Sequence, residues 1–271
     1  MPELPEVETT RRGIEPHLLN HTLTGAVVRQ RRLRWPIPTG LAKKICGQTI
    51  YAVERRAKYL LLKLDQGTIM LHLGMSGSLR ITPVDTPAEK HDHVDLLLDS
   101  GQCLRLRDPR RFGSLHWISG EVQQHALLNK LGPEPLHEEF DSEYLFQKSR
   151  KRKLAVKLFI MDSKVVVGVG NIYASEALFR AGIRPTRAAG RVSRADYVRL
   201  VSAIKQVLQA AILAGGTTLQ DFTNSDGKPG YFKQALHVYG RADEPCHTCA
   251  LPIKHRIMGQ RATYYCPHCQ S

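Results

Sequence analysis

The chain begins with MPELPEVETT, and its second and third residues could together do chemistry at a sugar carbon. Removal of Met1, which a small second residue permits, would leave Pro2 with a free secondary amine. Because an α-amino group has a pKa of about 8, part of it is neutral at pH 7 and could attack an aldehyde-level carbon to form an iminium. The adjacent Glu3 could transfer the proton. Proline followed by glutamate is also typical of a helix start, and these residues alone favour that simpler interpretation.

Four cysteines near the end of the chain have the spacing of a metal site. They form two C-x-x-C pairs separated by sixteen residues: Cys246, Cys249, Cys266 and Cys269. Two such turns supply four thiolates, which is typical of zinc, and a site closed by four thiolates leaves no position for water. We therefore expect one structural Zn²⁺ ion, with His247 and His268 facing solvent. Two disulfides are the alternative, which an intracellular chain disfavours. Cys46 and Cys103 are expected to be ordinary core or strand cysteines.

The segment between the cysteine pairs, KHRIMGQRATYY, predicts a metal-supported hairpin that displays Lys254, His255, Arg256 and Arg261. This basic surface agrees with the whole chain, whose 271 residues carry a formal net charge of +14. Such an excess indicates a polyanionic partner, with nucleic acid favoured over an anionic membrane surface. A solvated basic loop is the alternative for the hairpin, and a nucleic-acid contact is favoured over it.

The sequence predicts no membrane span, because no run approaches roughly 18 uninterrupted apolar residues. Acidic residues occupy the N-terminus, where a signal peptide has basic residues followed by an apolar run. We therefore expect a cytoplasmic protein. Hydrophobic residues make up 42% of the chain, which is enough for a packed core.

The candidate residues must be held by two kinds of structure, of which the first is a sheet. From about residue 49 to 118 the pattern is mostly short strands divided by Gly or Asp turns, and DLLLDSGQCLRLRD predicts a hairpin around Asp99–Gly101. Closely spaced strands without intervening helices predict an antiparallel sandwich or barrel. Pro133 and Pro135, in LGPEPL, mark a plausible domain boundary.

After this boundary the pattern becomes helical. We predict helices over Leu154–Met161, Asn171–Ala181 and Ser193–Ala214. The last of these begins with a capping-box-like pair, Ser193 and Asp196. The chain is therefore predicted to be α+β, with a β-rich N-terminal part, a helical part and a short tail that contains the cysteines.

Four further segments could bind a ligand, although each also has an ordinary structural interpretation. Two glycines of GVGNIY precede a predicted helix, whose free N–H groups could bind phosphate together with Asn171. The Gly/Pro-rich SDGKPGYF could close over a ligand or simply connect two elements. LHLGMSG and DPRRFG place Met75, Arg110 and Phe112 at turns, where they could part stacked bases or merely belong to the core or surface.

Many segments of the chain, taken in order, resemble one protein family. They are MPELPEVET, RRAKYLLL, LHLGMSGSLR, KHDHVD, DPRRFG, LGPEPL, VVVGVGNIYASE, GGTTLQDF, SDGKPGYF, VYGR and GQRATYYCPHCQ. Together they resemble the bacterial formamidopyrimidine-DNA glycosylases, and the match runs from residue 1 to the C-terminus.

The resemblance implies a mechanism for the N-terminus. In the family, the mature N-terminal proline attacks C1′ of a damaged purine nucleotide, typically 8-oxoguanine or a formamidopyrimidine, and Pro2 matches that residue. Glu3 would protonate the sugar and assist departure of the base, and Glu6 would line the lesion pocket. The iminium acidifies the neighbouring sugar position, so β- and then δ-elimination cut the strand. Lys58 and Arg261 match the proton donors for these two eliminations.

The resemblance also implies a set of DNA contacts. Met75, Arg110 and Phe112 match a trio that fills the gap left by the flipped base, with Arg110 facing the orphaned cytosine. His91 and Arg152 match further DNA-contact positions. The clamp around the phosphates of the flipped nucleotide would consist of Lys58, His72, Asn171, Tyr239 and Arg261.

The implied fold has three domains. Residues 1–132 would form the catalytic β-sandwich with flanking helices, 133–236 a helix–two-turn–helix domain, and 237–271 the four-cysteine zinc-finger hairpin. A loop from about Thr217 to Tyr231 would fold over the extruded base, and these two residues would line the lesion pocket. The partner would be double-stranded DNA that contains oxidised purines or abasic sites. We expect no membrane association, and a monomer associated with the bacterial nucleoid.

Two positions depart from the family pattern, and both concern turns of the zinc tail. Family members often have Gly after the second cysteine, where this chain has Ala250. Gly is also common in the linker before the first cysteine, where this chain has Asp243.

Two other functions remain open. A related glycosylase that prefers oxidised pyrimidines, such as endonuclease VIII, is disfavoured by Leu4 in PELPE and by the intact Met75, Arg110 and Phe112. A non-catalytic zinc-ribbon protein would bind through its basic surfaces alone, and blocking Pro2 would not affect it.

Overall fold

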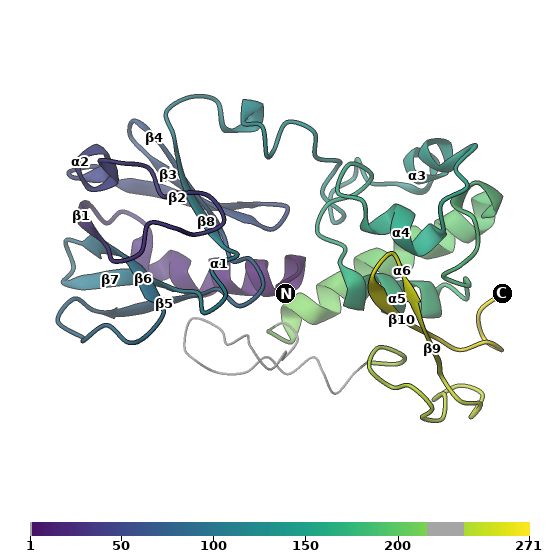
Figure 1. The fold of residues 1–271 in the computed structure, drawn as a ribbon. Helices are drawn as coiled ribbons and strands as arrows, with labels where there is room; N and C mark the ends of the chain where they lie inside the picture. Colours follow the sequence, from purple (N-terminus) through teal and green to yellow (C-terminus); the bar gives the residue numbers. More distant parts are fainter. Residues whose placement is uncertain (1, 216–235) are drawn as a thin grey trace. The chain divides into compact units, whose positions relative to one another are not determined.

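The computed structural model describes residues 2–215 and 236–271, and they divide into two compact units (Figure 1). Residues 2–129 belong to the first unit, and residues 130–213 and 236–271 form the second. The helices after residue 130 and the cysteine-containing tail therefore share one unit, and the division into three domains stays a prediction. No helix in the described part of the chain is both long and apolar enough to cross a membrane.

The first unit is built on two four-stranded antiparallel sheets. One sheet has the strand order β1-β6-β7-β5, and the other has the order β2-β3-β4-β8. The strands are β1 (Leu23–Val28), β2 (Ile50–Arg56), β3 (Tyr59–Leu64), β4 (Gly67–His72), β5 (Ser78–Pro83), β6 (Asp92–Leu98), β7 (Gln102–Arg107) and β8 (Ser114–Ile118). Buried leucine, isoleucine and valine side chains from both sheets form one core, which confirms the predicted sandwich. The predicted hairpin around Asp99–Gly101 joins β6 to β7.

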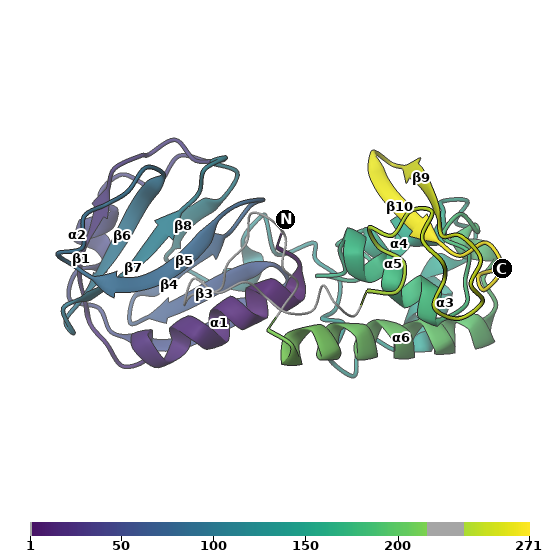
Figure 2. The same cartoon turned by 90° about the horizontal axis from the view of Figure 1, so that it is seen from below.

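One long helix closes a side of this sandwich. α1 (Leu4–Leu18) buries Leu4, Val7, Ile14 and Leu18, whose spacing places them on one helical face. The helix packs against β2, β3 and β5, which are strands of both sheets (Figure 2). Two short elements complete the unit, α2 (Leu41–Ile45) and the 3₁₀ turn η1 (Val122–Gln124).

The second unit begins with helices close to the predicted ones. They are α3 (Ser142–Ser149), α4 (Val156–Met161), α5 (Asn171–Arg180), the 3₁₀ turn η2 (Ala189–Arg191) and α6 (Arg194–Leu213). α4 begins two residues later than predicted, because Ala155 forms an isolated β-bridge with Ala188 and the carbonyl of Leu154 accepts a hydrogen bond from the Ala189 N–H (2.8 Å). The predicted cap of α6 is confirmed, since the Asp196 N–H donates to the Ser193 hydroxyl (3.1 Å).

The second unit ends in a two-stranded hairpin, β9 (Lys254–Met258) and β10 (Arg261–Tyr265). β10 packs on α5. The last residues are also anchored, because the Gln270 side chain donates to the carbonyl of Ile183 (2.9 Å) and the Arg184 N–H donates to the carbonyl of Ser271 (3.0 Å). The tail is therefore held to the helices by hydrogen bonds as well as by the cysteines.

Candidate functional site

The candidate nucleophile and its neighbour lie at the start of α1. Pro2 is buried, Glu3 is 3% exposed and Glu6 is completely buried. The N–H of Glu3, the N-cap residue, donates to Oε2 of Glu6 at 2.7 Å, so Glu6 is the acceptor at the third helical position of a capping box. The positive end of the helix dipole favours carboxylates at this position. The helix start favoured by the sequence is therefore present, and it holds Glu3 next to Pro2 in a fixed backbone conformation.

Lys58 and His72 lie close to one another in the first unit. Lys58 lies in the turn between β2 and β3, and His72 ends β4 with its ring 4.8 Å from that of Tyr59. Burial, together with the charges of Lys58 and Arg34, lowers the pKa of His72 to about 4. His72 Nδ1 accepts the Gly74 N–H (3.0 Å), so the neutral ring carries its hydrogen on Nε2. His72 is thus a neutral hydrogen-bond donor at pH 7.

The predicted base-gap trio lies on two loops of the first unit. Met75 is half-buried in the loop between β4 and β5, whereas Arg110 and Phe112 are exposed in the loop between β7 and β8. The Arg110 guanidinium carbon lies 5.1 Å from the centre of the Phe112 ring. The Arg110 N–H donates to the Ser76 hydroxyl (3.2 Å), which joins the two loops. His91 precedes β6 and has a φ of 79°.

In the second unit, Asn171 and Tyr239 are brought together beside the hairpin. The Asn171 side chain donates to the carbonyl of Ala262 (2.9 Å) and to the Tyr239 hydroxyl (3.4 Å). Its own Oδ1 is buried and has no hydrogen-bond partner among the described residues. Arg261 directly precedes Ala262 and is exposed at the start of β10. Asn171, Tyr239 and Arg261 therefore lie in one local cluster.

The remaining predicted contacts are not part of this cluster. Arg152 is exposed after α3. Thr217 and Tyr231, with the loop between them and the segment SDGKPGYF, lie outside the described residues. The first residue of α5 is Asn171, and Gly170 precedes it as the N-cap residue, as the glycine-before-helix pattern predicted.

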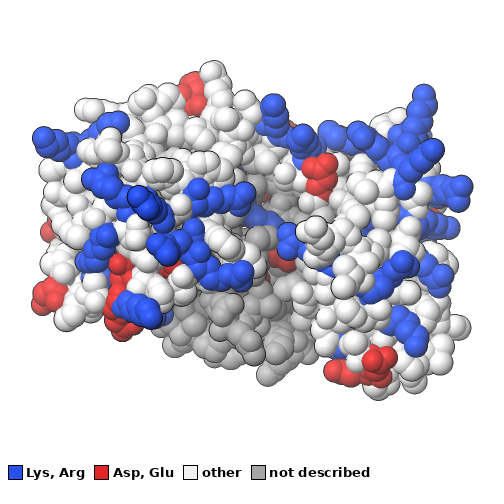
Figure 3. All heavy atoms as spheres, viewed as in Figure 1, with Lys and Arg blue, Asp and Glu red and all other residues white. Residues whose placement is uncertain are grey.

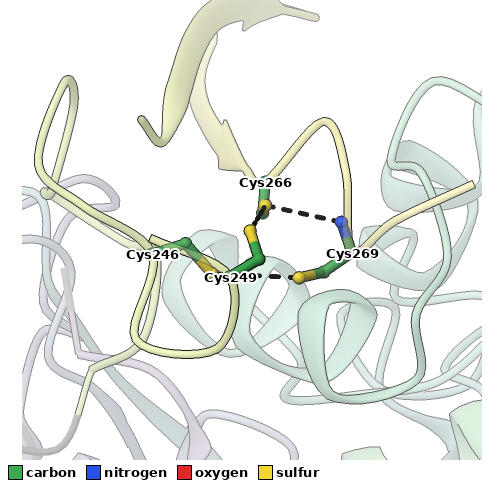
Figure 4. Close-up of side chains that lie close together, drawn as sticks. All are labelled: Cys246, Cys249, Cys266 and Cys269. Carbon is green, nitrogen blue, oxygen red and sulfur yellow. Dashed lines mark hydrogen bonds between the residues drawn. The ribbon is translucent and has the colours of Figure 1, made fainter. Parts of the chain in front are cut away.

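The four tail cysteines gather at one point (Figure 4). Their sulfur atoms all lie within 4.8 Å of one another, with 3.9 Å between Cys246 and Cys269 and 3.4 Å between Cys249 and Cys266. Four sulfurs around one zinc ion at about 2.3 Å lie roughly this far apart. The N–H of Thr248 donates to the sulfur of Cys246 (3.4 Å), which favours a thiolate ligand. The site therefore fits one Zn²⁺ ion with a closed set of four ligands.

The alternatives for the cysteines do not match this arrangement. All six cysteines are free, and the sulfur separations exceed the roughly 2.05 Å of a disulfide. His247 and His268 are exposed, as expected. Cys103 is buried in β7, as expected, but Cys46 is exposed after α2, where its thiol donates to the carbonyl of Thr24 (3.3 Å). The expectation of a core or strand position for Cys46 was wrong, because the short α2 ends before it.

Sequence reasoning missed two buried charged residues that support the cluster in the second unit. Lys157 is completely buried, and its ammonium donates to the carbonyl of Ala262 (3.0 Å) and the hydroxyl of Thr263 (2.9 Å). Glu176 is 3% exposed, and its carboxylate accepts the N–H groups of residues 237, 238 and 239 at 2.8–2.9 Å. A charged residue among apolar helical neighbours was the one available signal for both.

Sequence reasoning also missed a pair of buried polar residues in the first unit. Ser76 and Asp108 are buried polar residues between the two loops that carry the base-gap trio. An Asp before Pro at a turn was the available signal for Asp108. On the face drawn in Figure 3, Lys and Arg side chains cover much more of the surface than Asp and Glu do, in agreement with the net charge of +14.

Comparison with known proteins gives three family matches in order along the chain. Residues 1–115 match the formamidopyrimidine-DNA glycosylase N-terminal domain, and residues 131–223 match the H2TH domain of the same glycosylases. Residues 243–271 match a zinc finger found in FPG and IleRS. Together with the cysteine cluster, the last match confirms the predicted structural zinc.

Individual relatives match over the full length. Formamidopyrimidine-DNA glycosylases from Thioalkalivibrio sulfidiphilus and Alkalilimnicola ehrlichii are 60% and 61% identical, with 100% of both chains covered. The crystal structure of Fpg from Thermus thermophilus is 38% identical, with a TM-score of 0.89 over 99% of this chain and 98% of that chain. A complex between Lactococcus lactis Fpg and DNA containing an abasic site is 34% identical, with a TM-score of 0.92 over 100% of both chains.

Proposed function

Because this chain belongs to the formamidopyrimidine-DNA glycosylase family, we propose that it is a bifunctional base-excision repair enzyme that removes oxidised purines from duplex DNA and then cleaves the abasic site. The observation that carries the proposal is the full-length match at about 60% identity together with Pro2 and Glu3 at the start of α1. Solved relatives were crystallised with DNA containing an abasic site or a Fapy-dG lesion, which supports this class of substrate.

The first step is attack of the Pro2 nitrogen on C1′ of the flipped nucleotide. A C–N bond forms, the glycosidic bond breaks, and the base leaves with its bonding electrons and takes up a proton. Glu3 protonates the sugar oxygen, so the ring opens and the covalent intermediate becomes an iminium. The short hydrogen bond from the Glu3 N–H to Glu6 supports this assignment, because it fixes the backbone that carries both reacting groups.

Strand cleavage follows from the electron-withdrawing iminium. It acidifies the C2′ hydrogen, so a proton is lost from C2′ and the 3′-phosphate leaves by β-elimination. A second elimination then releases the 5′-phosphate. We assign proton donation in these two steps to Lys58 and Arg261, respectively. The neutral His72, with its hydrogen on Nε2, suits donation to a phosphate oxygen. We also assign DNA contacts to Asn171, Tyr239, His91 and Arg152.

The four-cysteine zinc site holds structure in this proposal and takes no part in the chemistry. Cys246, Cys249, Cys266 and Cys269 would close the coordination shell, so no ligand position remains for water or substrate. Its role is to order the hairpin on which Arg261 lies. We further propose that the protein acts as a monomer in the bacterial cytoplasm, in association with nucleoid DNA.

Borohydride trapping tests the chemistry directly. A duplex with one 8-oxoguanine opposite cytosine is incubated with the protein and sodium borohydride, and the adducted peptide is identified by mass spectrometry. We expect an adduct on the Pro2 nitrogen, and no adduct in a preparation that retains Met1. A protein with Met1 removed that binds DNA normally but forms no adduct would instead be a non-catalytic DNA-binding protein.

A second duplex distinguishes the two branches of glycosylase. The same assay with thymine glycol in place of 8-oxoguanine should give slower adduct formation, because Met75, Arg110 and Phe112 match the purine-lesion branch. Faster trapping on thymine glycol would assign the chain to enzymes that excise oxidised pyrimidines.

A further inference from the structure

Two loops of the first unit run side by side because of the sheet topology. One joins β4 to β5 and contains Met75, and the other joins β7 to β8 and contains Arg110 and Phe112. β4 and β8 are neighbours in one sheet, and β5 and β7 are neighbours in the other. Both loops therefore cross between the two sheets at the same edge. Strand pairing alone is therefore sufficient to place the two loops next to each other.

A buried serine–aspartate pair links these loops. Asp108 is completely buried, and its Oδ1 accepts a hydrogen bond from the Ser76 hydroxyl (2.9 Å). Its Oδ2 accepts the Gly113 N–H (2.7 Å), which closes the loop that carries Arg110. The Ser76 oxygen in turn accepts the Arg110 N–H (3.2 Å). One carboxylate and one hydroxyl thus determine the backbone positions of both loops.

The backbone of Asp108 is also held. Its N–H donates to the carbonyl of His91 (3.1 Å), and its own carbonyl lies 2.8 Å from His93 Nε2. Asp108 can therefore move only if several buried hydrogen bonds break, each of which is expensive to leave unmade.

Close packing between the loops reinforces the link. Gly74 has a φ of 65°, and a Cβ atom at this position would overlap the backbone of Phe112 and Gly113. On the other side of Met75, the Gly77 N–H donates to the carbonyl of Leu73 (2.8 Å) and closes a tight turn. The backbone on both sides of Met75 is therefore fixed against the loop that presents Arg110 and Phe112.

We propose that Ser76 and Asp108 are positioning residues that hold Met75, Arg110 and Phe112 at a fixed mutual spacing, so that the three side chains enter the base stack as one rigid group. The inference rests on the proposed function. Both residues are buried, and their side chains bond to each other and to the backbone of the loop that carries Arg110, so they act through the loops. Parting two stacked base pairs requires the wedge and the side chain facing the orphaned base to arrive together. The bond from the Arg110 N–H to Ser76 makes recognition of that base depend on the pair.

Ser76→Ala tests the proposal, because it removes the bonds to both Asp108 and Arg110 while changing one buried atom. The readout is the ratio of single-turnover rates of 8-oxoguanine excision opposite cytosine and opposite adenine. We expect this ratio to fall about tenfold, which corresponds to the loss of one strong buried hydrogen bond in the selective step. Affinity for undamaged duplex should not change. Destabilisation alone would slow excision from both duplexes and leave the ratio unaltered.

Ser114→Ala is the matched control. Ser114 is completely buried at the start of β8, next to the same loop, and its hydroxyl has no hydrogen-bond partner among the described residues. The same chemical change there should leave the ratio at the wild-type value. If Ser76→Ala does not fold, the isosteric Asp108→Asn replaces it in the same assay with the same expected fall.

The outcomes separate this inference from the function on which it rests. A wild-type protein that releases neither base contradicts the proposed function and the inference together. An active wild type whose cytosine-to-adenine ratio is unchanged in Ser76→Ala contradicts the inference alone. A fall of equal size in Ser114→Ala also contradicts it, because any change in side-chain volume near the loop would then have the same effect.

Discussion

At the scale of single residues, the lowered pKa of His72 predicts how the stability of the protein depends on pH, even without DNA. Its pKa is lowered to about 4 by burial and by the charges of Lys58, Arg34 and His116. An unfolded histidine has a pKa of about 6.5, so below that pH the unfolded chain binds a proton that the folded chain does not. The stabilisation is complete above about pH 6.5 and is lost progressively as the pH falls towards 4. By pH 4.5 the loss should be about 2–3 kcal/mol.

The measurement compares urea unfolding of the wild type and His72→Gln at pH 7 and pH 4.5. Glutamine keeps an N–H donor but does not titrate, so its free energy of unfolding should fall by about 2–3 kcal/mol less between the two pH values. Because all other titrating groups are the same in both proteins, the difference between the two losses isolates the contribution of His72. Equal losses in the two proteins, or an NMR titration of His72 near pH 6.5, would contradict the buried neutral ring.

Two residues of the zinc tail should be stabilised to different extents when each is replaced by glycine. Ala250 and Asp243 both have a φ of 63°, and they are the two positions where the resemblance led us to expect Gly. An alanine in the left-handed region costs about 1–2 kcal/mol, whereas an aspartate tolerates it better. Glycine relieves this strain but loses more backbone entropy on folding, which offsets part of the gain. Ala250→Gly should therefore stabilise the tail by about 0.5–1 kcal/mol and Asp243→Gly by less.

Thermal unfolding of the zinc-loaded protein measures both effects, and a neighbouring residue gives the control. Ala242 has no positive φ, so Ala242→Gly should lower the melting temperature slightly. Destabilisation by Ala250→Gly would show that the side chain makes a contact that outweighs the backbone strain.

The residues that could be predicted from the sequence are those whose chemistry is local. The cysteine spacing defines a metal site without knowledge of the fold, and Pro2 with Glu3 are neighbours in the chain. Asp108 and Ser76 are 32 residues apart and meet only because β4 pairs with β8 and β5 with β7. Sequence periodicity shows that strands exist but not which strands pair, so this hydrogen bond could not be predicted.

At the scale of elements, long periodic segments were predicted closely, whereas some short ones without a clear pattern were missed. The helix expected over Ser193–Ala214 is observed as α6, Arg194–Leu213, because its apolar face spans many turns and its cap is local. α2 and α3 are short helices, and β1 is a strand that contains Gly25, so none has a clear periodic pattern. Their positions depend on packing against the sandwich or against α6, which a local pattern does not record.

The hydrogen bonds between α5 and the segment after residue 236 should contribute to the stability of the second unit. The Glu176 carboxylate accepts three backbone N–H groups, including that of Tyr239, and it is 3% exposed. In Glu176→Gln one oxygen becomes an NH₂ group that faces N–H donors. The free energy of unfolding should fall by about 2–3 kcal/mol. DNA affinity should fall as well, because Tyr239 loses its backbone anchor.

The exposed Glu139 provides the control. Glu139→Gln makes the same change of charge and atom type at the surface, and both stability and DNA affinity should stay at the wild-type values. Urea unfolding and fluorescence anisotropy measure the two quantities. A Glu176→Gln protein that is as stable as the control would show that these three N–H groups find other partners.

At the scale of the whole molecule, the net charge of +14 predicts salt-dependent DNA binding. Each phosphate neutralised by the protein contributes about −0.9 to the slope of log K against log salt concentration. Arg152→Ala should make this slope shallower by about one unit if Arg152 contacts a phosphate. Arg180→Ala removes the same charge from an exposed position outside the predicted contacts and should leave the slope nearly unchanged. Equal slopes in the two variants would remove Arg152 from the DNA interface.

Because the chain divides into two units, removal of the zinc ion should affect the tail and the sandwich differently. The core of the tail is small, since the buried residues of its apolar cluster are Val238, Ile253, Cys246 and Cys266. So few apolar groups cannot offset the entropy of ordering the hairpin, and the ligand bonds must supply the difference. The sandwich has a large core of its own to which the tail does not contribute. A strong chelator in reducing buffer should therefore unfold the tail and leave the sandwich intact.

Hydrogen exchange of the full chain, followed by mass spectrometry, distinguishes these two regions. After chelation, amides of β9 and β10 should exchange rapidly, whereas those of β3 and β4 should keep their protection. The second elimination, which releases the 5′-phosphate, should be lost, since Arg261 lies on the hairpin, and should return when zinc is added back. Protection that persists in β9 and β10 would show that the hydrogen bonds from Lys157 and Asn171 to the carbonyl of Ala262 are sufficient to hold the hairpin. Loss of protection in β3 and β4 as well would show that the two units unfold as one cooperative structure, despite their separate cores.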